Sequence, residues 1–167
     1  MKVRLLFPAP TIREKGNTMS TNQKQFFDPR ILALSEHLEL SGDEYEEIEE
    51  TQYGDNLFEF GHGEYLVLTD EEADQAVREN IEESVWAFNT SFLSCHVKNG
   101  ISVDVINLLQ EKCEDGSEAI KSLIKDFDHF VDDAVGTDGR GHFLSHYDGD
   151  EHEVNIEGEY FYIYRLN

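Results

Sequence analysis

Residues 57–68 read Leu57-Phe58-Glu59-Phe60-Gly61-His62-Gly63-Glu64-Tyr65-Leu66-Val67-Leu68. Strand-forming residues lie on both sides of a glycine-rich turn, which is the pattern of an antiparallel hairpin. A second hairpin is predicted at the C-terminal end, where Val154–Ile156 and Tyr160–Tyr164 flank the turn residues Glu157-Gly158-Glu159. We therefore expect a sheet built from one hairpin in the first half of the chain and one at its end.

An amphipathic helix is predicted directly after the first hairpin. Thr69, followed three residues later by Glu72, has the spacing of a capping box, in which each side chain bonds the other residue's backbone amide. Helical spacing of apolar residues then continues to about Phe88. The predicted outer face carries five carboxylates, which are Glu71, Asp74, Glu79, Glu82 and Glu83.

Another helix is predicted before the first hairpin. Asp28 is its N-cap, Pro29 its first residue, and Gly42 stops it. Residues 43–56 follow, and we interpret them as a solvated acidic segment with one short helix or strand. The carboxylates of this segment include Glu46, Glu47 and Glu50.

Two helices are predicted between the hairpins, after the capping-box helix. A short one is capped by Ser102, and a longer one begins at Ser117 and ends at Gly136. A break is expected at residues 89–91, ahead of both. Residues 139–149 are expected to alternate turns with strand-forming residues.

Together these elements predict an α+β protein, with an antiparallel sheet of the N-terminal and C-terminal hairpins packed on three or four helices. The simplest assembly places the helices against one face of that sheet. Residues 1–18 carry four basic residues against a single acidic one, Glu14. We interpret residues 1–18 as a disordered leader or an overlong start, and residues 19–167 as a single acidic α+β domain.

The chain carries 36 acidic and 13 basic residues, for a formal net charge of -23. Its hydrophobic fraction of 39% and aromatic fraction of 11% are too high for a disordered acidic tail. Nucleic acid and anionic membranes carry the same sign of charge, so we expect neither as a direct partner, and a basic protein is the natural complement. With two cysteines and no long apolar run, the chain is expected in the cytoplasm.

The acidic surface suggests imitation of a nucleic-acid backbone. Residues three and four apart on a helix lie about 5 to 6 Å from each other, comparable to phosphates that advance about 3.4 Å per strand in B-DNA. A merely soluble acidic surface is the alternative. The residues predicted to bind a partner are Glu46, Glu47, Glu50, Glu71, Asp74, Glu79, Glu82 and Glu83.

A second group of polar residues follows the stretch Asp138-Gly139-Arg140-Gly141-His142. Clustered imidazoles and carboxylates can hold a metal or act as a general base, but the spacing matches no zinc or EF-hand motif. The structural interpretation has the glycines permitting a turn, Arg140 pairing with nearby acids and His142 capping or packing. The residues of the metal or catalytic alternative are Arg140, His142, His146 and Asp148.

Cys95 and His96 raise the question of a thiol nucleophile. Adjacent residues rarely place a base on the neighbouring sulfur, and the surrounding residues are apolar, so Cys95 is expected to be buried. We assign no catalytic residue and expect no cofactor.

Several stretches resemble a group of small acidic proteins encoded by bacteriophages and plasmids, whose function is generally unassigned. These stretches are Glu64–Asp74, Val85–Asn89, Asp138–Ser145, Tyr147–Gly149 and Tyr162–Arg165, and the resemblance covers about residues 57–167. It implies a mobile-element setting, in which small acidic proteins often neutralise host defence by occupying the DNA-binding groove of a restriction enzyme or CRISPR effector. It carries no catalytic residue that can be transferred.

The functional hypothesis is a non-enzymatic acidic inhibitor that binds a basic, nucleic-acid-binding host defence protein by DNA mimicry. One alternative is a small metal- or histidine-dependent enzyme that uses the stretch around Arg140. A second is an acidic regulator that binds a different basic host protein. The oligomeric state is left open, with a homodimer among the arrangements considered.

Overall fold

The computed structural model describes residues 28–167, so the predicted leader, residues 1–18, lies outside the described residues. Six α-helices, three 3-10 helices and five strands follow one another in this part of the chain. In chain order they are α1 (Pro29–His37), η1 (Glu44–Glu47), β1 (Glu49–Glu50), β2 (Leu57–Phe60), β3 (Gly63–Leu68), α2 (Asp70–Ser84), η2 (Val85–Ala87), α3 (Thr90–His96), α4 (Val103–Gln110), η3 (Cys113–Gly116), α5 (Ser117–Leu123), α6 (Phe127–Leu144), β4 (His152–Ile156) and β5 (Glu159–Arg165).

The sheet has five antiparallel strands in the order β1-β2-β3-β5-β4. β2 pairs with β3 and β4 pairs with β5, so both predicted hairpins are confirmed. β3 also pairs with β5, with Tyr65 opposite Arg165 and Leu68 opposite Tyr162, and this pairing joins the hairpins at the centre of the sheet. The α+β class is confirmed, and β1 adds an edge strand from the acidic segment.

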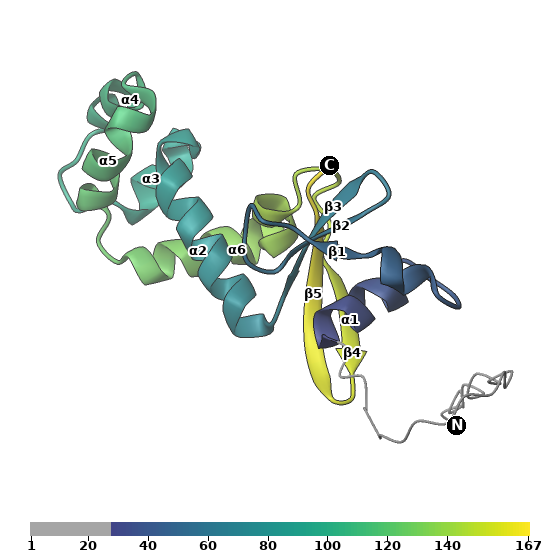
Figure 1. The fold of residues 1–167 in the computed structure, drawn as a ribbon. Coiled ribbons are helices and arrows are strands. Elements are labelled where there is room, and N and C mark those ends of the chain that lie inside the picture. The colour runs from purple at the N-terminus through teal and green to yellow at the C-terminus, as the bar shows by residue number, and fades with distance from the viewer. Residues whose placement is uncertain (1–27) are drawn as a thin grey trace, which may run out of the picture.

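Helices cover both faces of the sheet (Figure 1). Phe161 and Ile163 of β5 pack in one cluster with Leu34 of α1, whereas Tyr164 packs in another cluster with residues of α2 and α6. The expectation that all helices lie against one face is wrong. The central strands β3 and β5 carry apolar side chains on both faces, and therefore both faces need cover.

The larger cluster extends beyond the sheet into a helical lobe of α2 to α6, which Figure 1 shows at one side of the sheet. Each helix of the lobe contributes buried side chains, among them Ala73, Ile81, Leu93, Ile106, Ile120 and Phe130. α2 runs from the sheet into the lobe. Its inner face is thus covered along its length, while its outer face meets solvent.

The capping box at the start of α2 is confirmed. The Glu72 carboxylate accepts from the Thr69 amide at 2.8 Å, and the Thr69 hydroxyl oxygen accepts from the Glu72 amide at 3.4 Å. α2 ends at Ser84, before the predicted end at Phe88, and the chain continues as the 3-10 helix η2.

Asn89 does not open a simple break, because its side chain caps the unpredicted helix α3. The predicted caps of two other helices are confirmed: Asp28 accepts from the Arg30 amide, and Ser102 from the Val105 amide. α1, however, ends at His37, before Gly42. Within residues 28–167, no helix combines the length and the apolar character that crossing a membrane requires.

The predicted helix from Ser117 to Gly136 is two helices. Ile124 has an extended backbone that forms an antiparallel bridge with Val97, and this interrupts the helical hydrogen bonds after α5. α6 then begins behind Asp126, whose carboxylate accepts from the His129 amide at 3.2 Å. The apolar residues keep their helical spacing on both sides of the interruption, which explains why a single helix was expected.

Gly136 does not end α6, which continues to Leu144 in place of the predicted turns and strand. The chain is kinked within α6 at Gly139, whose backbone has φ 78° and ψ 158°. A positive φ costs glycine little because it has no Cβ. After the kink, the last turn of α6 packs on β5 and on residues 149–151.

Candidate functional site

The outer face of α2 presents carboxylates to solvent, as predicted. Ala73, Val77 and Ile81 are buried on the inner face. The five predicted carboxylates lie away from this inner face, and four of them are exposed: Glu71, Asp74, Glu79 and Glu83.

Two grooves lined by acidic side chains flank α2. The first, about 590 Å³, lies against α6, and the second, about 490 Å³, lies against η3 and α5. Arg78 lines both grooves and pairs with Asp128 at 2.6 Å. We call the carboxylates that line these grooves the α2 acidic surface: Glu71, Asp74, Glu79, Glu82, Glu83, Glu114, Glu118 and Asp132.

Some members of the α2 acidic surface are neutralised within the molecule. Asp74 pairs with Arg140 at 3.0 Å, and Glu82 pairs with Lys121. Among residues 28–167, six members take part in no ion pair: Glu71, Glu79, Glu83, Glu114, Glu118 and Asp132. Four of these six line the second groove, which therefore concentrates unpaired negative charge.

Three of the predicted partner-binding residues lie elsewhere. Glu46 and Glu47 belong to η1, and Glu50 belongs to β1. η1 lies against α1, on the face of the sheet opposite to α2 (Figure 1). The eight predicted residues therefore form two separate patches.

Sequence reasoning missed Glu114, Glu118 and Asp132 as members of the α2 acidic surface. Glu114 comes from η3, Glu118 from α5 and Asp132 from α6. Their acidity was visible in the sequence, but their position beside α2 depends on how the helices of the lobe pack.

Arg140 is the centre of an ion-pair cluster that connects α2, α6 and the sheet. Its guanidinium bonds Asp70 at 2.8 Å, Asp74 at 3.0 Å and Glu151 at 2.8 Å. It also stacks over the Tyr162 ring, 4.2 Å from its centroid. Only 11% of the Arg140 side chain is exposed, so the predicted pairing of this arginine with nearby acids is present and is structural in character.

The electrostatics of this cluster stabilise the charged arginine. Burial alone would lower the pKa of Arg140, but hydrogen bonds to Glu151 and Asp70 outweigh it and raise that pKa above its ordinary value. The buried Tyr164 hydroxyl donates to the same Glu151 carboxylate at 2.5 Å. Burial and this hydrogen bond raise the pKa of Tyr164, which keeps the hydroxyl protonated as a donor.

The two glycines beside Arg140 shape the backbone that carries this arginine. Gly139 supplies the kink that carries Arg140 toward α2 and Glu151. Gly141 packs directly on the backbone of residues 149–151, where a Cβ would collide. Both glycines therefore set the position of the arginine.

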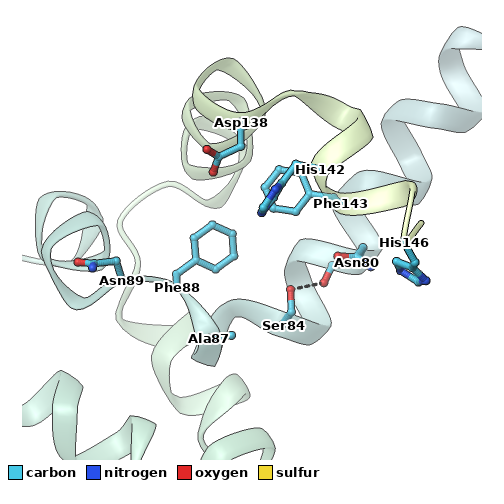
Figure 2. Close-up of a pocket in the computed structure, with 9 residues that line it drawn as sticks. All are labelled: Asn80, Ser84, Ala87, Phe88, Asn89, Asp138, His142, Phe143 and His146. Carbon is cyan, nitrogen blue, oxygen red and sulfur yellow. Dashed lines mark hydrogen bonds between the residues drawn. The ribbon is translucent and has the colours of Figure 1, made fainter. Parts of the chain in front are cut away.

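The two histidines of the alternative interpretation line a different hollow, of about 420 Å³, drawn in Figure 2. His142 and His146 lie there with polar and aromatic side chains of α2 and neighbouring elements. The His142 ring packs edge-on against Phe143, with centroids 5.0 Å apart. Neither Arg140 nor Asp148 lines this hollow.

Asp148 lies in the loop before β4. It accepts from the Ser145 hydroxyl at 2.6 Å and from the Asp150 amide at 3.0 Å, and these bonds lower its pKa. Arg140, the histidine pair and Asp148 therefore occupy three separate places. The structure does not bring the four residues together as one metal or catalytic site.

Cys95 and His96 point in different directions. Cys95 is exposed, which makes the prediction of a buried thiol wrong, and its sulfur contacts the Ser91 carbonyl at 3.4 Å. His96 is the buried member of the pair and lies 3.0 Å from an oxygen of Asp133. Because α3 was not predicted, the sequence could not show which of the two neighbours faces inward.

Two groups of side chains in residues 28–167 have the geometry to share a metal ion, with ligand atoms within 4.8 Å of one another. They are His96, His129 and Asp133, and Asp148, Asp150 and His152. Sequence reasoning missed the first group. The spacing of His129 and Asp133, one helical turn apart, was a local signal, but the third residue comes from α3.

No family model, curated protein or solved structure matches the chain. The resemblance to phage and plasmid proteins therefore rests on the motifs alone and stays a prediction. The function has to be argued from the surface of the molecule.

Proposed function

We infer that the protein is a non-enzymatic binding protein whose α2 acidic surface docks on a basic, nucleic-acid-binding protein. One observation carries this proposal: the groove between α2 and α5 is lined by five glutamates from three elements, which are Glu79, Glu82, Glu83, Glu114 and Glu118. Only Glu82 of these five has an ion-pair partner in the described chain.

Unpaired carboxylates that face one another across a groove repel each other, and this opposes folding. Lysine and arginine side chains of a partner would remove the repulsion and form charge-assisted hydrogen bonds. The same field would attract a basic partner from a distance and raise its association rate by about 10- to 1000-fold at low salt.

Apolar surface lies close to this groove. α4 contacts both η3 and α5 and exposes Val103, Val105 and Leu108. Charge alone selects partners poorly, whereas apolar anchors beside a charged patch add specificity. The end of the lobe thus combines an acidic groove with a helix that exposes three apolar side chains.

The target proposed is a host defence protein, such as a restriction enzyme or a CRISPR effector, whose DNA-binding groove the acidic surface occupies. The carboxylate spacing on α2 and the resemblance of residues 57–167 to phage and plasmid proteins support this choice. An acidic regulator would use the same surface on another basic protein, so competition by DNA separates the two.

The test compares two variants of the full chain that each lose four negative charges. The first replaces Glu79, Glu83, Glu114 and Glu118 with Gln. The second, a matched control, replaces the exposed Glu46, Glu47, Glu49 and Glu50, also with Gln. Each is added to DNA cleavage reactions of a panel of restriction enzymes and a Cas9-type effector. We expect the wild type and the control to inhibit at least one of these enzymes, and the first variant to lose that inhibition.

Excess duplex DNA should relieve the inhibition, since DNA and the protein compete for one groove. Equal loss in both variants would show that total charge matters and the α2 acidic surface does not. Inhibition that salt abolishes but DNA never relieves would contradict DNA mimicry and favour the regulator. If the protein inhibits no enzyme in the panel, the proposal of a host-defence target is contradicted.

A further inference from the structure

His96, His129 and Asp133 converge beside the α3–α6 contact. His96 Nε2 lies 3.0 Å from Asp133 Oδ2, and His129 Nε2 lies 3.5 Å from the same oxygen. Ligand atoms bound to one zinc ion at about 2.1 Å in a tetrahedron lie roughly 3.4 Å apart. The two measured distances lie on either side of this value.

The orientation of the His96 ring is fixed by its other nitrogen. Nδ1 lies 3.0 Å from the Phe92 carbonyl oxygen, which accepts hydrogen bonds and cannot donate. Nδ1 therefore carries a proton, and in the neutral ring the Nε2 lone pair faces the Asp133 carboxylate. A lone pair facing a carboxylate is repulsive unless a proton or a metal cation lies between the two atoms, and metal-bound histidines typically donate their second nitrogen to a carbonyl in this way.

The frame around His96 is rigid. Its ring packs against those of Phe92 and Phe130, with centroids 4.6 and 5.2 Å away. Its carbonyl accepts from the Lys125 amide at 2.9 Å, next to the bridge between Val97 and Ile124. These contacts hold the C-terminal end of α3 against the start of α6, so that His96 reaches the other two ligands without rearrangement.

A hollow of about 300 Å³ opens over the three ligands and is also lined by Cys95, Lys125 and Asp126. The His96 side chain is 9% exposed, while that of His129 is 64% exposed. The site thus has one fixed inner ligand and one outer ligand that is free to adjust. The hollow leaves room for a further ligand from solvent.

We propose that His96 Nε2, His129 Nε2 and an oxygen of Asp133 bind one first-row divalent cation, with zinc as the best match. Two imidazoles and one carboxylate form a donor set that suits zinc and its neighbours, whereas calcium and magnesium prefer oxygen ligands throughout. Three protein ligands below an open hollow leave a coordination position for water, as in zinc sites that are not purely structural.

The other group, Asp148, Asp150 and His152, carries no such inference. Its Asp148 oxygen Oδ1 already accepts two hydrogen bonds from Ser145 and Asp150, and both aspartates lie on an exposed loop before β4. It therefore serves as an internal control.

The test is a titration of the full chain with Zn²⁺ by calorimetry, repeated with Co²⁺ by visible absorption. We expect one ion per chain at the high-affinity site, a loss of affinity on the order of 100-fold for His129→Ala, and a similar loss for Asp133→Asn. His152→Ala should bind as the wild type does. Because His129 is exposed, its substitution leaves the core intact, and circular dichroism of each variant checks this.

Nuclear magnetic resonance of the histidine rings gives a second readout. Zinc should shift the Nε2 resonances of His96 and His129 and leave those of His152 in place. Several weak ions per chain, bound equally by wild type and His129→Ala, would show adventitious binding to surface carboxylates and overturn the proposal. A His96 Nε2 that stays protonated in the presence of excess zinc would overturn it as well, in favour of a simple ion pair with Asp133.

Discussion

Carboxylates gather both around Arg140 and in the groove between α2 and α5, but only those around Arg140 are all neutralised by a cation of the same chain. Around Arg140 three of them, Asp70, Asp74 and Glu151, share one largely buried guanidinium. In the groove between α2 and α5, four unpaired glutamates face solvent. Both regions border the same helix, α2. Acidity alone therefore assigns no role: the fold pairs every carboxylate around Arg140 with that cation, whereas it leaves four glutamates of the groove without an ion-pair partner and open to a partner protein.

The largest expected effect comes from removing the cation of the structural cluster. Arg140→Met should lower the free energy of unfolding by about 3 kcal/mol, because it leaves three carboxylates without their shared partner. Urea denaturation at neutral pH measures this.

Arg78→Met is the matched control. Its pair with Asp128 is more exposed, so its loss should cost less than about 1 kcal/mol. An equal loss of unfolding free energy in the two variants would show that the Arg140 cluster is no more structural than the exposed pair of Arg78 and Asp128.

A smaller effect of opposite sign is expected in the open groove. Replacing Glu79, Glu83, Glu114 and Glu118 with Gln should raise the free energy of unfolding by up to about 1 kcal/mol at low salt, because like-charge repulsion is removed. The gain should shrink at high salt, where repulsion is screened. Thermal unfolding at two salt concentrations gives both values, and destabilisation of this variant would mean that the glutamates support the fold.

The smallest effect concerns a contact between two histidines. Burial, together with His152, whose ring lies 4.5 Å away, lowers the pKa of His37, while Asp148 opposes this. The folded state thus binds the His37 proton less tightly than the unfolded state, so this contribution to stability is complete above the unfolded pKa of about 6.5 and is lost as pH falls through the lowered folded value.

His152→Asn should raise the pKa of His37 toward its ordinary value and weaken that pH dependence. Titration of the His37 ring protons by nuclear magnetic resonance checks the prediction. An unchanged His37 pKa in the variant would show that burial acts alone.

Much of the fold could be predicted because its signals are local. The hairpin at residues 57–68 and the Thr69–Glu72 capping box depend on neighbours within a few residues. The interruption at Ile124 could not be predicted, because it depends on a bridge to Val97 across the lobe. Gly139 and Gly141 resemble turn residues, and only the packing of α6 on β5 and on residues 149–151 shows that they position Arg140.

The candidate site was predictable to the same extent. The carboxylates of α2 follow from helical spacing, but Glu114 and Glu118 join them only through the packing of η3 and α5. Glu46, Glu47 and Glu50 look equivalent in sequence, yet the sheet separates them from α2. His96, His129 and Asp133 come from two helices, of which one was not expected.

The central claim is that the α2 acidic surface occupies a DNA-binding groove, and displacement of DNA tests it most directly. Fluorescently labelled duplex DNA is bound to an effector that the protein inhibits, and fluorescence anisotropy is recorded as protein is added. The proteins compared are the wild type, the groove variant, in which Glu79, Glu83, Glu114 and Glu118 are Gln, and the control, in which Glu46, Glu47, Glu49 and Glu50 are replaced. We expect displacement by the wild type and the control and none by the groove variant. Displacement by all three in proportion to net charge, or inhibition while the DNA stays bound, would contradict it.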